Sequence, residues 1–379
     1  MWNKVKLGEI VEKVVDNRGK NPPIEKEGIP LIETSSISGN NKFPNLNAVQ
    51  KFVSEATYSN WFRAGHPQTN DMLIITVGNG IGSVSIMPKI KASIAQNIVA
   101  LRFDPQLYDG NFYYYYFSQN LIQDFLQSLD IGSAQPSLKV PHLLDLYVPV
   151  PSLEEQKSIA PILSSLDDKI DLLHRQNKTL EALAETLFRQ WFVEEAGGET
   201  GNLGDIIELI YGKALKEEIR SGSGFPVVGS SGIVGYHSEF LVDGPGIVIG
   251  RKGTLGKVIY LFENFFPIDT TYFTKSKINS EGLFYEYFLL KTLNFEKMNT
   301  DSAVPGLNRE IALSTEIKIP PFKRVKEYNS YCANLFKKLK HNNTQILTLT
   351  QIRDTLLPTL MSGEVKVKKS IQTNLHATI

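Results

Sequence analysis

The pattern of apolar and polar positions is most regular between Ser152 and about Phe192. Apolar side chains recur there at alternating steps of four and three residues, which is the heptad spacing of a helix that packs along another helix. These positions are Ile159, Leu163, Leu166, Ile170, Leu173, Leu180, Ala184, Leu187 and Trp191, with Asn177 in the remaining slot. Ser152 and Glu155 form a capping box that predicts the start of the helix, and Gly197-Gly198 predicts its end. We expect one continuous helix of roughly 60 Å.

A second stretch, from about Phe322 to Met361, has the same spacing. Its apolar seam contains Tyr328, Cys332, Leu335, Leu339, Asn342, Ile346, Leu349, Arg353, Leu356 and Leu360. Free cysteines are among the most buried residues, so Cys332 is interpreted as a packing residue and not as a nucleophile.

Each seam holds one asparagine, and these two residues predict how the helices pair. If the helices are antiparallel with Asn177 opposite Asn342, every other seam position gains a partner, and Leu166 facing Arg353 is the one poor layer. A parallel pair would leave the amide of Asn177 unsatisfied beside Ile346, at a cost of roughly 1–3 kcal/mol. Charge also favours pairing, because residues 151–196 carry 5 basic and 9 acidic groups and residues 321–379 carry 10 and 3. The sequence therefore predicts an antiparallel coiled coil within one chain.

The rest of the chain contains an internal sequence repeat of two copies. The sequence KLGEIVE at 6–12 returns as NLGDIIE at 202–208, and FYYYYFSQNLIQDF at 112–125 returns as FYEYFLLKTLNF at 284–295. Four further pairs keep the same order, which predicts a duplicated domain. Each copy mixes short β-like runs and turns with one aromatic helix, which is typical of an α+β domain with an irregular, mainly antiparallel sheet.

These patterns predict two repeated mixed α/β domains joined by two long helices, with approximate two-fold symmetry. The expected segments are a first domain at 1–150, a first long helix at 151–196, a second domain at 197–320, a second long helix at 321–363 and a C-terminal tail at 364–379.

Composition limits where the protein is expected to act and which sites it is expected to contain. A hydrophobic content of 42% in 379 residues is ample for buried cores, yet no apolar run is long enough to cross a membrane. The start lacks the apolar segment of a signal peptide, so we expect a cytoplasmic protein that does not contact a membrane. One cysteine and six scattered histidines give no metal-ligand spacing, so no metal site is predicted.

Two motifs have a possible catalytic or nucleotide-binding interpretation. Asn21-Pro22-Pro23-Ile24 is similar to the Asn-Pro-Pro-aromatic signature of adenine-N6 methyltransferases, but Ile24 replaces the aromatic residue, and a turn beside a binding surface is favoured. The glycine-rich loop at 78–82 precedes a strand-like run and not a helix, which favours a hairpin turn over a phosphate site. It corresponds to residues 250–253 of the second copy, where the polar residues differ, as suits recognition.

Polar and basic residues occupy matching loops of both copies. Asn, Gln, Arg and Lys read base edges and Ser and Thr contact phosphates, although solvated turns have the same composition. The candidates for DNA binding are Arg18, Lys20, Asn21, Ser35, Ser36, Asn40, Asn79, Gln96, Asn97, Gln135 and Lys139 in the first copy, and Lys213, Ser230, Ser231, Tyr236, Arg251, Lys252, Thr270, Thr271, Asn308 and Arg309 in the second.

Over nearly its whole length the chain resembles the specificity (S) subunit of type I restriction-modification systems. The resemblance is carried by the duplicated domain, by DNRGKNPP at 16–23, by VPVPSLEEQKSIAPILSSLDDKIDLL at 148–173 and by LLPTLMSGEV at 356–365. The second copy departs from the pattern, with PPFKRVKEYNSYCANLF where Glu-Gln is expected.

The resemblance implies a subunit that reads double-stranded DNA and has no catalytic activity or cofactor of its own. It implies partners, namely two methyltransferase (M) subunits that use S-adenosylmethionine for adenine-N6 methylation and restriction (R) subunits. Each domain would read one half of a bipartite, asymmetric site, and the coiled coil would fix the spacer. The alternatives are a stand-alone adenine methyltransferase that uses Asn21-Pro22-Pro23 and a coiled-coil scaffold that binds no nucleic acid.

Overall fold

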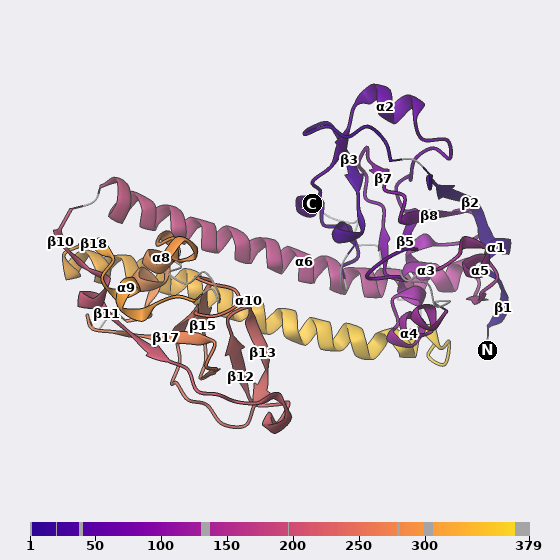
Figure 1. The fold of residues 1–379 in the computed structure, drawn as a ribbon. Helices are drawn as coiled ribbons and strands as arrows, with labels where there is room; N and C mark the ends of the chain where they lie inside the picture. The colour runs from indigo at the N-terminus through magenta and orange to yellow at the C-terminus, as the bar shows by residue number, and fades with distance from the viewer. Residues whose placement is uncertain are drawn as a thin grey trace, which may run out of the picture. The chain divides into compact units, whose positions relative to one another are not determined.

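The structure, a computed structural model, describes residues 2–19, 21–37, 41–129, 137–195, 197–278, 281–298 and 306–367. It divides into two compact units (Figure 1). The first unit contains Met1–Leu172 and Ile346–Ile379, and the second contains Leu173–Gln345. Two long helices, α6 (Leu153–Arg189) and α10 (Phe322–Met361), contribute residues to both units.

The remaining elements of the two units follow the same order, except that α2 and α4 of the first unit have no counterpart in the described part of the second. Those of the first unit are β1 (Asn3–Lys6), α1 (Leu7–Ile10), β2 (Val11–Asp16), β3 (Ile29–Ile32), β4 (Phe52–Val53), α2 (Glu55–Asn60), β5 (Met72–Ile75), β6 (Val84–Ile86), β7 (Ser93–Ile94), β8 (Ile98–Phe103), α3 (Gly110–Phe117), α4 (Asn120–Ser128), α5 (Val140–Leu144) and β9 (Tyr147–Val150). Those of the second unit are β10 (Glu199–Asn202), α7 (Leu203–Ile206), β11 (Ile207–Tyr211), β12 (Phe225–Gly229), β13 (Gly232–His237), β14 (Gly246–Gly250), β15 (Val258–Leu261), β16 (Phe266–Pro267), β17 (Thr271–Ser276), α8 (Phe284–Thr292), α9 (Arg309–Leu313) and β18 (Glu316–Ile319).

The sheets repeat as the sequence does. The first unit has sheets of order β2-β8-β5-β6, β4-β3-β7 and β1-β9, and the second has β11-β17-β14-β15, β13-β12-β16 and β10-β18. Within the described residues, the pairs β3–β7 and β12–β16 are parallel and the other strand pairs are antiparallel. The predicted α+β class with repeated, mainly antiparallel domains is confirmed.

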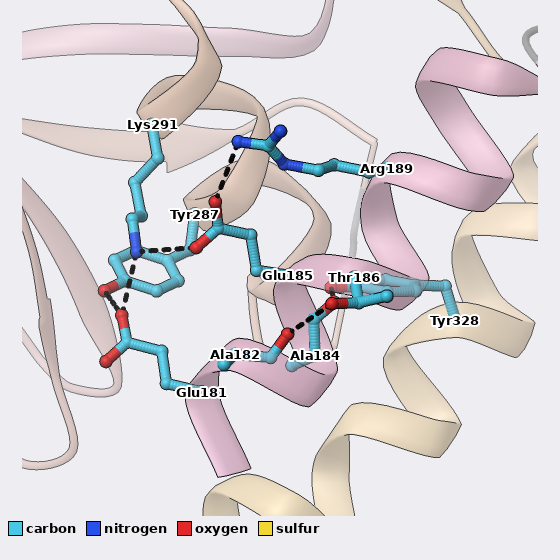
Figure 2. Close-up of polar contacts among 9 residues, drawn as sticks. All are labelled: Glu181, Ala182, Ala184, Glu185, Thr186, Arg189, Tyr287, Lys291 and Tyr328. Carbon is cyan, nitrogen blue, oxygen red and sulfur yellow. Dashed lines mark hydrogen bonds and ion pairs between the residues drawn. The ribbon is translucent and has the colours of Figure 1, made fainter. Parts of the chain in front are cut away.

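An aromatic helix covers the largest sheet of each unit. In α3 the residues Phe112, Tyr113, Tyr114, Tyr115 and Phe117 are buried, and α8 buries the run from Phe284 to Leu290. Buried tyrosines need a partner for the hydroxyl group. Tyr115 donates to Asp167 at 2.6 Å, and Tyr287 donates to Glu181 at 2.7 Å (Figure 2). Burial raises the pKa of both tyrosines, so their hydroxyls stay protonated as donors.

Helices α6 and α10 run antiparallel in each unit. In the second unit the amide of Asn342 donates to Oδ1 of Asn177 at 2.9 Å, and the hydroxyl of Tyr328 donates to the carbonyl of Ala184 at 3.0 Å. Residue numbers therefore rise along one helix as they fall along the other, as predicted. Cys332 is buried in this seam, and burial raises the pKa of its thiol to about 11, which fits the predicted packing role.

The seam of α6 differs in detail from the heptad prediction. Asp167, and not Leu166, is buried and binds Arg353 at 3.0 Å, so the expected poor layer is an ion pair. Phe188 is likewise buried at 1% exposure, where Leu187 was predicted. An α-helix has 3.6 residues per turn and drifts about 20° per heptad from a 3.5 repeat, which moves the buried face by one residue.

Candidate nucleic-acid interface

Main-chain hydrogen bonds gather several loops at one edge of the large sheet in the second unit. The N–H of Leu307 donates to the carbonyl of Arg251 at 3.0 Å, and the N–H of Arg251 donates to the carbonyl of Thr270 at 2.9 Å. Gly212 donates in the same way to Thr271 at 3.1 Å. We call the described residues 211–213, 230–231, 251–253, 269–271 and 306–309 the second loop edge.

The first unit has the same construction. The N–H of Leu138 donates to the carbonyl of Thr76 at 2.8 Å, and the N–H of Thr76 donates to the carbonyl of Asn97 at 2.8 Å. Residues 16–18, 76–79, 95–97 and 137–139 form the first loop edge. Because these bonds use only the main chain, they place the loops without fixing which side chains the loops present.

Strand register gives the equivalent positions of the two edges. Asp16 is the last residue of β2 and pairs with Val99, while Tyr211 is the last residue of β11 and pairs with Tyr272. The hydrogen bonds described above make Thr76 equivalent to Arg251. The two edges therefore share a backbone and differ in chemistry at matched positions.

Basic and aromatic side chains cluster on the second loop edge. The guanidinium of Arg251 lies 5.1 Å from the ring centroid of Tyr211, and that of Arg309 lies 5.4 Å from it. The ring of Tyr211 also packs edge-on against Tyr272 at 4.9 Å. Lys213 and Lys252 belong to the same edge, which therefore carries four cations, two of them against one half-exposed aromatic ring. A surface of this kind suits an anionic, aromatic ligand such as nucleic acid.

The predicted residues of the first unit do not all lie together. Arg18, Asn79, Gln96, Asn97 and Lys139 belong to the first loop edge, and Arg18 is ion-paired with Asp16. Ser35 and Asn21 are exposed, outside that edge as defined, and Ser36 is buried at 1% exposure. Lys20, Asn40 and Gln135 lie outside the described residues.

Most predicted residues of the second unit do come together. Lys213, Ser230, Ser231, Arg251, Lys252, Thr270, Asn308 and Arg309 belong to the second loop edge. Tyr236 lies apart from them on β13 and is 40% exposed. Thr271 is fully buried, and its hydroxyl donates to the carbonyl of Ile268 at 2.7 Å. Asn308 caps α9, where its side chain accepts from the N–H groups of Glu310 and Ile311.

Tyr211 and Lys257 were not predicted. Tyr211 is the residue on which the basic cluster is built, and Lys257 donates to the carbonyl of Ser231. The sequence signal for Tyr211 is its place at the end of a strand, two residues before Lys213. The equivalent positions of the first copy are Asp16 and Arg18.

The glycine-rich loop at 78–82 is the turn of the β5–β6 hairpin, as predicted. Gly78, Gly80 and Gly82 have φ angles of 93°, 84° and 85°, which side chains with a β-carbon rarely adopt. The following element is a strand, so no helix N-terminus is available to hold a phosphate.

The Asn-Pro-Pro motif lies outside two cavities formed by the described residues, one in each unit. A cavity of about 340 Å³ in the first unit is lined by Tyr115, Asp167 and Arg353 among others. A cavity of about 640 Å³ in the second unit has a mixed lining that includes the aromatic residues Phe284 and Phe336. Asn21 and Ile24 are instead exposed at the surface.

A search of the described part of the chain finds no group of three or more His, Cys, Asp or Glu side chains placed to hold a metal ion. Its helices include none that is both long and apolar enough to span a membrane.

Comparison with known proteins gives the family. A family model described as the type I restriction modification DNA specificity domain matches residues 1–182 and again 196–351. The chain belongs to the family of type I restriction-modification specificity subunits. The resemblance stated from the sequence is thereby confirmed, and the two matches cover both copies of the repeat.

Relatives of the specificity family support this assignment along most of the chain. The type I restriction enzyme MjaIX specificity subunit of Methanocaldococcus jannaschii is 28% identical over 304 residues, which is 69% of this chain and 70% of the relative. The putative type I specificity subunit S.MgeORF438P of Mycoplasma genitalium is 26% identical over 90% of this chain and 92% of its own length. The crystal structure of a type I restriction-modification S subunit from M. genitalium shares the fold, with a TM-score of 0.62 and 22% identity over 95% of this chain and 96% of that one.

Proposed function

We propose that this specificity subunit reads a bipartite, asymmetric DNA site with its two loop edges and is not itself an enzyme. Each edge faces the major groove of one half-site. Partner M subunits, two per chain, then methylate adenine N6 with S-adenosylmethionine, and R subunits cleave unmodified DNA. The chain acts in the cytoplasm, where this DNA is found.

The observation that carries the proposal is the shared backbone of the two loop edges with unlike side chains. The matched strand ends bear Asp16 and Tyr211, and Arg251, which is half-buried, stands where the first copy has Thr76, whose side chain is fully buried. Base edges in the major groove present donor and acceptor patterns that such side chains distinguish. Because the two edges differ, the two half-sites that they read differ as well.

The proposed DNA contacts are the predicted residues whose described side chains are exposed or partly exposed, together with Lys20, Asn40 and Gln135, which lie outside the described residues. Ser36 and Thr271 are left out, because side chains at 1% and 0% exposure do not reach a ligand. The set is Arg18, Lys20, Asn21, Ser35, Asn40, Asn79, Gln96, Asn97, Gln135 and Lys139 for one half-site, and Lys213, Ser230, Ser231, Tyr236, Arg251, Lys252, Thr270, Asn308 and Arg309 for the other. The paired helices, held in register by Asn177 and Asn342, set the spacer between the halves.

The test is the N6-methyladenine pattern of a host genome with and without this chain. We expect one bipartite motif to lose methylation when the chain is absent. Replacing residues 1–150 with the same segment of another specificity subunit should change one half of the motif only, and replacing residues 197–320 should change the other half only. These matched replacements serve as controls for each other.

Two outcomes would contradict the proposal. An unchanged methylation pattern would favour a scaffold that binds no nucleic acid. Binding of S-adenosylmethionine by the purified chain alone, lost on Asn21→Ala, would favour a stand-alone methyltransferase.

A further inference from the structure

One position of the repeated sheet carries an acidic side chain in the first copy and an aromatic side chain in the second. The last residue of β2 is Asp16, whose carboxylate is paired with Arg18 two residues later. The equivalent last residue of β11 is Tyr211, followed at the same distance by Lys213. A carboxylate neutralised by a neighbouring arginine in one copy is thus replaced by an aromatic ring in the other.

The ring of Tyr211 is held firmly on the second loop edge. It packs against Tyr272, whose ring is 1% exposed and whose hydroxyl donates to the carbonyl of Leu307 at 3.0 Å. Tyr211 itself remains 47% exposed. The ring of Tyr211 therefore packs against a buried ring and also presents a surface to solvent, which makes it a platform for other side chains.

Two guanidinium groups rest on this platform. Arg251 lies 5.1 Å and Arg309 lies 5.4 Å from the centroid of Tyr211, within the range of a cation–π contact. Arg251 is oriented further, because its Nη2 donates to the carbonyl of Asp269 at 3.0 Å. Its Nη1 has no hydrogen bond to the described residues, and its Nε is buried without a partner among them. In the contact inferred below, Nη1 and the second N–H of Nη2 are the donors to the ligand.

The guanidinium of Arg309 is engaged differently. Its Nε and Nη2 bind the carboxylate of Glu310 at 3.0 and 2.9 Å. Glu310 is highly exposed, and an exposed ion pair of this kind is weak enough for a nucleic acid to displace. Arg251 is therefore the group already prepared for recognition, and Arg309 flanks it.

A guanidinium that keeps one planar orientation is suited to guanine, whose O6 and N7 accept two parallel hydrogen bonds in the major groove. Stacking on an aromatic ring reduces the orientational freedom that an arginine side chain loses on binding. We propose that Arg251 reads a guanine in the half-site of the second domain and that Tyr211 is the positioning residue that holds Arg251 in the reading orientation. This inference rests on the proposed function and deepens it, since it names the base and the residues that recognise it.

The experiment uses the full chain assembled with its M subunits. The complex is mixed with double-stranded DNA in which the half-site of the second domain is randomised, and the retained DNA is sequenced. We expect the wild-type complex to prefer guanine at one position by roughly tenfold to one hundredfold. Arg251→Gln should abolish the preference at that position and leave the other half-site unchanged.

Variants of Tyr211 separate positioning from contact. Tyr211→Ala should reduce the guanine preference severalfold at the same position, while Tyr211→Phe, which keeps the ring, should preserve it. Tyr331→Ala removes another exposed tyrosine, 64% exposed on α10, and should leave every preference unchanged. An unchanged preference for the first half-site shows in each case that the variant is folded and assembled.

Several results would overturn the inference. One is that no guanine preference in the half-site of the second domain is lost in Arg251→Gln. Another is that Tyr211→Ala lowers the affinity for all DNA sequences equally, which would indicate a phosphate contact. The proposed function fails separately, if the wild-type complex selects no bipartite site at all. Selection of a bipartite site that neither Arg251→Gln nor Tyr211→Ala alters removes this inference alone.

Discussion

Each unit places one polar pair between α6 and α10, and the two pairs differ in charge. In the first unit Asp167 binds Arg353 at 3.0 Å, with 8% and 10% of their side chains exposed. In the second unit Asn342, fully buried, donates to Asn177 at 2.9 Å. Both pairs interrupt an apolar seam, yet one is an ion pair and the other joins two neutral amides.

The difference shows how much support each kind of pair requires. A buried charge is costly unless several groups neutralise and bond it. Asp167 accordingly accepts a further hydrogen bond from Tyr115 at 2.6 Å, and Arg353 also contacts Asp354 at 2.8 Å. The amide pair is satisfied less completely: Asn177 also donates to Oδ1 of Asn343 at 2.7 Å, but Oδ1 of Asn342 is buried without a partner among the described residues. Substitutions at these layers should therefore differ in cost.

The largest effect is expected from Asp167→Ala. The substitution leaves the guanidinium of Arg353 buried without its main partner, which should lower the free energy of unfolding by about 3–5 kcal/mol. The value should fall at the lower end, because Asp354 still faces Arg353. Urea denaturation of the full chain measures the loss.

Two further variants test the interpretation of this ion pair. Asp168→Ala removes the neighbouring exposed carboxylate and should cost less than about 0.5 kcal/mol. The double variant Asp167→Leu/Arg353→Leu should recover most of the lost stability, because an apolar pair needs no neutralisation. If Asp167→Ala and Asp168→Ala lowered the free energy of unfolding equally, the burial of Asp167 would not be what makes its ion pair important for stability.

A smaller effect is expected at the amide layer. Asn177→Leu removes the acceptor of the buried Asn342 amide and should cost roughly 1–3 kcal/mol in the same denaturation experiment. Replacing both asparagines with leucine should cost less than the single change, since no polar group is then left without a partner. Lys338→Ala, at an exposed site on α10, provides the control, because Asn343 accepts from Asn177 at 2.7 Å and belongs to the same layer. A double variant that is less stable than Asn177→Leu would show that the amides contribute net stability.

The smallest effect is expected where the charges are partly exposed, at the contact of α6 with α8 (Figure 2). Burial alone raises the pKa of Glu181, but hydrogen bonds from Tyr287 and Lys291 outweigh it, and the net pKa is lowered from 4.5. This carboxylate therefore stabilises the fold above pH 4.5, and its contribution disappears as the pH falls through the lowered pKa. Glu181→Gln should cost less than about 1 kcal/mol at pH 7.

The pH series provides the check on Glu181. The difference between wild type and Glu181→Gln should shrink below pH 4.5, while Glu194→Gln, at an exposed site five residues after the end of α6, should match the wild type throughout. A difference that persists unchanged at pH 3 would contradict the ionic origin.

Sequence patterns predicted the architecture because they repeat over long distances. Heptads and six ordered segment pairs gave the long helices, their antiparallel pairing and the duplicated α+β domain. The pairing of Asn177 with Asn342 followed from counting unsatisfied amides. These features depend on many residues at once, so local irregularities do not hide them.

Single side chains were predicted less well, for two physical reasons. The drift of a 3.6-residue helix away from a 3.5 repeat buries Asp167 and Phe188 in place of Leu166 and Leu187. In the sheets, the exposure of a polar residue depends on strand register, which buries Thr271 and exposes Tyr211. Tyr211 acquires its role only when β11, β14 and α9 come together, and no short motif reports that contact.

The main-chain bonds that gather the loop edges have a consequence for how such a protein can change over generations. Leu138 and Leu307 reach Thr76 and Arg251 through peptide groups alone. A substitution at position 251 can therefore alter what the second edge presents, while the main-chain hydrogen bonds that hold the edge stay in place. The equivalent Thr76 is fully buried, so the first edge presents exposed residues such as Asn79 instead. New preferences are accessible by single substitutions in one copy, with the other copy as an unchanged anchor.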